Sequence, residues 1–145
     1  MIAVFHPDAP GTVKLGAIGV ALLAVLDIAR HVRWLRAVPI GESIFWAGLL
    51  RVGVTLGVGL CLAWGIARLN RGLYLSWFAI SLLFAGVEIA LPAWHLISLS
   101  PDIGAIAVGP QAVIMSLLWL VTAALLVTPA SVRAFRHHAA RQTAE

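Results

Sequence analysis

The sequence predicts an all-α membrane protein with four transmembrane helices in an antiparallel, up-down-up-down bundle. Hydrophobic residues make up 61% of the 145 residues, charged residues only 11%, and the mean hydropathy is +0.99. Soluble domains carry about 25% charged residues, so this chain cannot cover a water-facing surface. Short polar loops between the apolar runs place neighbouring helices antiparallel. The same composition excludes a disordered chain, and the lone Cys61 excludes a disulfide-stapled domain.

Each crossing of the hydrocarbon core needs about 20 mostly apolar residues. The four spans of this single domain are predicted over 13–35, 44–67, 73–97 and 104–128. The first is the shortest in its apolar part, and it spans only if Arg30, Arg33 and Arg36 extend outward to the membrane surface. A cleaved signal peptide is the alternative for this segment. A retained helix is favoured, because no small-x-small cleavage site precedes these arginines and Asp27 lies where one belongs.

Lysine and arginine are unevenly divided between the two ends of these spans. The end with the N-terminus and the basic polar tail 129–145 holds Lys14, Arg68, Arg71, Arg133, Arg136 and Arg141. The opposite end holds three arginines at 30, 33 and 36. The positive-inside rule therefore predicts that the N- and C-termini are both cytoplasmic. Nine arginines against one lysine favour a GC-rich bacterial genome, and hence the bacterial plasma (inner) membrane.

The net charge of +4 and the pI near 10.7 do not indicate a nucleic-acid partner. The basic residues lie between long apolar runs, where they mark the ends of membrane spans rather than a continuous basic patch. We therefore expect the lipid bilayer to be the immediate partner of the chain.

Three charged residues lie within the predicted spans and form a polar layer. Asp27, Arg51 and Glu88 each lie five to seven residues from a tryptophan at the outer helix end. At about 1.5 Å per residue, all three lie roughly 8–10 Å deeper in the membrane than the outer tryptophans. Arg30, on the same helix face as Asp27, supplies a second positive charge. Charged side chains in spans commonly face the bundle interior and mark functional sites.

Three uncharged residues are candidate additions to the layer. Thr55 shares a helix face with the arginine of the second span, and Ser81 lies seven residues before Glu88 on one face. Gln111 joins the layer if the fourth helix begins several residues before it. If Pro110 is instead the first helical residue, which suits proline, Gln111 lies at the interface, and both alternatives stay open.

The polar layer has three interpretations. It is a structural ion-pair network that fixes helix order, an outward-opening pocket that binds a charged ligand or passes protons, or a docking site for another membrane subunit. Interhelical polar contacts in bilayers average only about 0.6 kcal/mol. A structural network would therefore specify geometry more than it would stabilise the fold.

Glycine and histidine supply two further candidates. Gly53 and Gly57 match the small-xxx-small pattern that lets helix backbones approach closely, either within this chain or in a dimer. His31 and His95 lie toward the outer side, where two facing imidazoles could ligate a b-type haem. Metal ligation by these histidines with Asp27 and Glu88 ranks lower, because their depths differ. No cofactor is therefore the first expectation.

The sequence contains no phosphate-binding glycine loop, nucleophile elbow or paired catalytic motif. We therefore favour a non-enzymatic accessory or interaction subunit of a membrane complex, whose partner is another membrane subunit or a second copy. The alternative is a small-molecule or ion (proton-coupled) binding or transport protein that uses Asp27, Arg51 and Glu88. A third hypothesis is a haem b or quinone redox subunit that uses His31 and His95.

Overall fold

The computed structural model describes residues 4–36, 39–83 and 110–142, and these are helical with no strand. Their helices are α1 (Gly11–Leu35), α2 (Ser43–Ala67), an unlabelled helix over Arg71–Leu83, α5 (Pro110–Leu126) and α6 (Pro129–Gln142). The predicted all-α class is thus confirmed for this part of the chain. Most of the predicted third span and the start of the fourth, with Glu88 and His95, lie outside the described residues.

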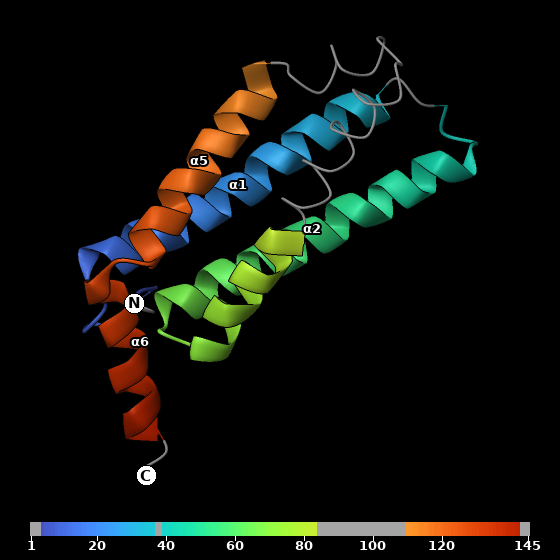
Figure 1. Ribbon diagram of the computed structural model, residues 1–145. Helices are drawn as coiled ribbons and strands as arrows, with labels where there is room; N and C mark the ends of the chain where they lie inside the picture. The colour runs from blue at the N-terminus through green and yellow to red at the C-terminus, as the bar shows by residue number, and fades with distance from the viewer. Residues whose placement is uncertain (1–3, 37–38, 84–109, 143–145) are drawn as a thin grey trace.

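Helix α1 is the centre of the described structure, with α2 packed on one side and α5 on the other (Figure 1). Both neighbours run antiparallel to α1. On the α5 side, Gly16 faces Leu126 and Gly19 faces Thr122, so residue numbers fall along α5 as they rise along α1. On the α2 side, Gly59 faces Ala24.

Small residues bring these helices close together. A methyl group added to Gly16, Gly19 or Gly59 would collide with the facing side chain of the neighbouring helix. Without a hydrophobic driving force between helices in lipid, such close backbone approach is what stabilises their packing. The glycines of α1 and α2 therefore fix the spacing of the three-helix centre.

The turn from α2 into the helix Arg71–Leu83 depends on Leu69 and Asn70. The N–H of Leu69 donates to the carbonyl of Ile66 (3.0 Å), and that of Asn70 to the carbonyl of Gly65 (2.8 Å), which together satisfy the last carbonyls of α2. Leu69 adopts a left-handed backbone conformation (φ 60°), although its side chain is buried. The Asn70 side-chain oxygen then accepts from the N–H of Leu73 (3.1 Å) and caps the next helix.

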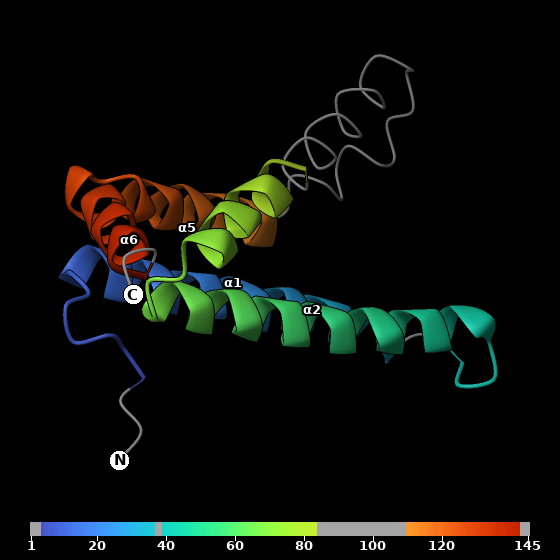
Figure 2. The same ribbon diagram turned by 90° about the horizontal axis from the view of Figure 1, so that it is seen from below.

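Aromatic side chains join the helix Arg71–Leu83 to α5 and α6. Trp77 is buried and stacks on Trp119 of α5 with ring centroids 6.4 Å apart. Tyr74 stacks on Phe135 of α6 at 4.2 Å and donates a hydrogen bond from its hydroxyl to the carbonyl of Leu126 (3.2 Å). These ring contacts hold the helix Arg71–Leu83 against α5 and α6. Figure 2 shows how this helix follows α2 and lies on the side of the C-terminal helices.

Helix α6 turns away from α5 by 57°. Thr128 caps α6, because its hydroxyl oxygen accepts from the N–H of Ser131 (3.3 Å). Ser131, which is fully buried, shares a hydrogen bond with Thr12 of α1 (2.8 Å) and donates to the carbonyl of Leu125 (2.9 Å). The three hydroxyls thus tie the bend to the first turn of α1.

Two described helices are long and apolar enough to cross a membrane, over Gly11–Arg33 and Ser43–Ala67, or three if α5 and α6 are one bent span. Large apolar side chains are exposed along both, for example Leu15 and Ile18 on α1, and Leu50 and Val54 on α2. Soluble monomers rarely expose contiguous apolar patches of more than a few hundred Å². The described structure is therefore compatible with a membrane location.

Candidate functional site

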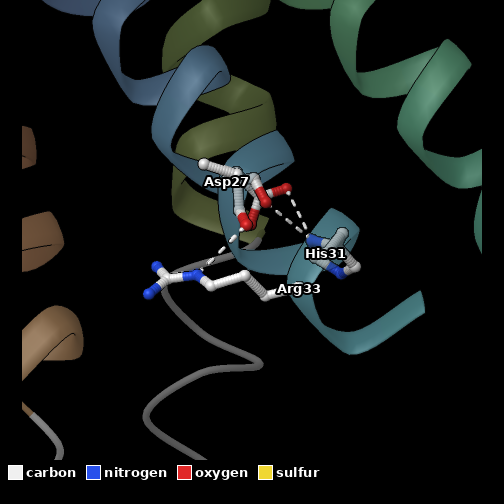
Figure 3. Close-up of polar contacts among 4 residues, drawn as sticks. Asp27, His31 and Arg33 are labelled. Atoms are coloured by element: carbon white, nitrogen blue, oxygen red, sulfur yellow. Dashed lines mark hydrogen bonds and ion pairs between the residues drawn. The ribbon is translucent and has the colours of Figure 1, made fainter. Parts of the chain in front are cut away.

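Asp27 and His31 contact each other on α1, four residues apart. The Nδ1 of His31 lies 3.4 Å from a carboxylate oxygen of Asp27 and 2.9 Å from its backbone carbonyl (Figure 3). A carbonyl oxygen only accepts, so Nδ1 carries a proton. The side chains are 12% (His31) and 23% (Asp27) exposed, so both are largely buried. Figure 3 shows Arg33 on the other side of the helix, where its Nε donates to the Ala29 carbonyl (3.4 Å).

The helix register places this pair level with two polar residues of α2. Since Gly59 faces Ala24 and the helices are antiparallel, the next turn of α1 is level with the preceding turn of α2. Asp27 is therefore level with Thr55, whose side chain is half-buried, and His31 is level with Arg51. Of the predicted layer, Asp27 is therefore level with the candidate addition Thr55, whereas Arg51 lies about one helical turn (about 5.4 Å) away along the axis.

Arg51 is level with His31, and its side chain is exposed. Among the described residues, no ion pair joins Arg51 to Asp27. Arg30 is likewise exposed, on α1. The predicted partner Glu88 lies outside the described residues, so the pairing of Arg51 with Glu88 stays a prediction.

The candidate additions occupy different positions. Ser81 is buried, near the end of the helix Arg71–Leu83. Gln111 lies in the first turn of α5, and its side chain is outside the described part of the structure. Neither the inclusion of Gln111 in the layer nor its interfacial alternative is tested by these positions.

The two glycines of the small-xxx-small pattern lie on an open face of α2. Among the described residues, nothing lies within 4 Å of a methyl group added to Gly53 or Gly57. Cys61 is exposed one helical turn further along, at the same four-residue spacing. In contrast, Gly59 and Gly65 of the same helix each face a side chain, of Ala24 and Leu73. In the part of the chain that the structure describes, α2 therefore has an open face along Gly53 and Gly57, and it is packed at Gly59 and at Gly65.

The redox hypothesis requires both His31 and His95, and His95 lies outside the described residues. His31 is held by Asp27 through Nδ1, which leaves Nε2 as its other ring nitrogen. Within the described ranges, no group of three or more histidine, cysteine, aspartate or glutamate side chains could hold a metal ion. Haem ligation by His31 and His95 stays a prediction, which a reduced-minus-oxidised optical spectrum of the purified protein would test.

A second polar cluster was not predicted from the sequence. His6 and Asp8, before α1, meet His138 and Arg141 of α6 in a cleft. The contributing segments are about 130 positions apart in the chain. No local spacing could have indicated the cluster, because it depends on the bend at Thr128.

The chemistry of the described site is limited to acid–base and ionic interactions. A carboxylate and an imidazole on one helix can hold or exchange a proton. The Thr55 hydroxyl, at the same level on α2, can donate or accept a hydrogen bond. Their arrangement does not include a nucleophile oriented by a base among the described residues. Comparison of the chain with known protein families, curated proteins and solved structures finds no match.

Proposed function

We propose that this chain is a four-span protein of the bacterial plasma membrane with both termini in the cytoplasm, and that it acts as a non-enzymatic subunit that assembles through α2. The antiparallel packing of α1, α2 and α5 supports an up-down-up-down arrangement. The N-terminal segment and α6 lie at one end of these helices, as the hydrogen bond between Thr12 and Ser131 requires. That end carries the larger number of basic side chains, which supports cytoplasmic termini.

The open face of α2 is the observation that carries the assembly proposal. Gly53, Gly57 and Cys61 recur every four residues along this face, and no described residue fills the space over the two glycines. Exposed Leu50 and Val54 flank them. Where α1 packs against α5 and α2, glycines contact the side chains of the neighbouring helix. An open glycine groove of the same kind is therefore complementary to a further helix.

We assign this groove to a second copy of the chain. A two-fold contact presents the same surface from both partners, and a groove between two equal glycine positions suits such self-pairing because each backbone enters the other's groove. Arg51 lies two residues before Gly53, about 200° around the helix, so no charge has to enter the contact. The resulting dimer brings the two copies of Cys61 near its axis.

Oxidative cross-linking of Cys61 tests this proposal without added labels. In native membranes treated with copper phenanthroline, we expect a disulfide-linked dimer that dithiothreitol reverses. Gly57→Leu should reduce the yield at least fivefold, because its side chain fills the groove. Val58→Leu, one residue away on an exposed position outside the groove, is the matched control and should cross-link like the parent.

Cys61→Ser must abolish the disulfide-linked dimer, which would show that the native thiol forms the bond. Equal cross-linking of the parent, Gly57→Leu and Val58→Leu would mean that random collision produces the dimer. That result, or the absence of any dimer while the chain remains in the membrane, contradicts assembly through this face.

A second function is favoured by the contact between Asp27 and His31. A largely buried carboxylate and imidazole in a membrane-spanning helix are the groups that proton-coupled proteins use. We propose that this pair, with Arg51 and Glu88, binds or passes protons. In liposomes with an internal pH dye, Asp27→Asn should abolish a proton flux that the parent supports, whereas Asp8→Asn, outside the spans, should leave it intact. A parent flux no greater than that of empty liposomes excludes this function.

A further inference from the structure

The N-terminal segment and α6 enclose a cleft at the basic end of the molecule. The backbone N–H of His6 donates to the carbonyl of Ala67 at the end of α2 (2.9 Å), which holds the segment across the helix ends. The ring of His6 then meets that of His138 edge-on, with centroids 4.7 Å apart. The cleft has a volume of about 410 Å³, within the range of roughly 300–1,000 Å³ usual for small-molecule sites.

The walls of the cleft supply hydrogen-bond donors. Asp8 donates its N–H to the Nδ1 of His6 (3.2 Å), so the ring proton of neutral His6 is on Nε2. The side-chain amide nitrogen of Gln142 lies 3.2 Å from the Nε2 of His138 and can only donate, which places the ring proton of neutral His138 on Nδ1. With the guanidinium of Arg141 and the ring of His137, the cleft lining is rich in donors.

One carboxylate, that of Asp8, opposes these donors. It lies 3.5 Å from an Arg141 nitrogen, with the two side chains 65% and 75% exposed. Exposed ion pairs contribute about 0–1 kcal/mol. An anion that offers several oxygens to a guanidinium forms a stronger, bidentate contact. Such a ligand would therefore displace Asp8 from Arg141.

We propose that this cleft binds the phosphate group of an anionic phospholipid; the lipid as its source rests on the membrane placement proposed above. The cleft lies at the ends of α1 and α2. The exposed apolar side chains along these two helices end there, so in a bilayer the cleft is at the level of the lipid headgroups. Leu69 and Ala134 give it an apolar lining beside the histidines and Arg141. Basic pockets between helices on the cytoplasmic side are the sites at which anionic headgroups bind.

Titration of the full-length protein in neutral detergent with dioctanoyl phosphatidylglycerol tests the site by calorimetry. Arg141→Gln should weaken binding about tenfold, since a charged hydrogen-bonding partner of the phosphate is lost. Arg136→Gln removes the same charge from an exposed position of α6 outside the cleft, and we expect less than a twofold effect. Asp8→Asn should tighten binding, because Arg141 is then free of its carboxylate partner.

Equal weakening by Arg141→Gln and Arg136→Gln, or equal binding of dioctanoyl phosphatidylcholine, would overturn the site in favour of general surface attraction. Inorganic phosphate is the third probe. If it binds as tightly as the lipid and with the same dependence on Arg141, the lipid as the source is wrong. The titration requires neither four spans nor the α2 contact, so its failure beside intact Cys61 cross-linking leaves the proposed function standing.

Discussion

At the scale of single residues, Asn70 joins two helices. Its backbone N–H closes the C-terminus of α2 and its side-chain oxygen caps the helix Arg71–Leu83. We expect Asn70→Ala to lower the free energy of unfolding by about 1 kcal/mol, which is typical of a lost N-cap. Asn70→Asp retains a capping oxygen and should stay near the parent. Unfolding in mixed micelles by added dodecyl sulfate measures both, and equal stability of all three proteins contradicts this role.

Some features of single residues could be predicted from the sequence, and others could not. Asp27 and His31 are four residues apart, so their shared helix face was predictable. The alignment of Asp27 with Thr55 was not fully predictable, because it depends on the register that Gly59 and Ala24 set between two helices. The backbone conformation of Leu69 was harder still to predict. A large side chain rarely adopts a left-handed backbone conformation, and it is found there because the turn buries it.

At the scale of elements, glycine positions separate packed helix faces from open ones. A side chain at Gly19 of α1 would collide with Thr122 of α5, whereas one at Gly53 of α2 meets open space among the described residues. We expect Gly19→Val to destabilise the fold by about 1–3 kcal/mol, the usual range for overpacking.

Gly53→Val is the matched control because it makes the same helix-propensity change. In monomeric micelles its free energy of unfolding should stay within about 0.5 kcal/mol of the parent, as for changes away from packed sites. If the two variants lose the same stability under dodecyl sulfate, the close packing of α1 on α5 is not what holds these helices.

Helix positions follow from hydropathy better than helix junctions do. The predicted ranges 13–35 and 44–67 can be compared with Gly11–Leu35 and Ser43–Ala67 in the structure. Long apolar stretches specify such helices because the backbone must be satisfied internally. The 57° bend before α6 depends on hydroxyl contacts of Thr128 with α1, and tertiary contacts of this kind leave no period in the sequence.

At the scale of the whole molecule, the first and last described segments of the chain meet. The segment before α1 contacts the end of α2 through His6 and contacts α6 through Asp8. The sequence predicted that both ends share one side of the membrane, from the count of basic residues. It could not indicate that they touch, since contacts between distant segments follow from the packing of the helices between them.

We propose that the chain crosses the membrane four times, with both termini in the cytoplasm. Single cysteines introduced into a Cys61→Ser background test it directly, at Gly41, Asn70, Ser100 and Gln142, with a membrane-impermeant maleimide. We predict that intact cells label the positions at Gly41 and Ser100, and that those at Asn70 and Gln142 react only after permeabilisation. Labelling of Asn70 from outside, or protection of Ser100 until permeabilisation, contradicts the four-span topology.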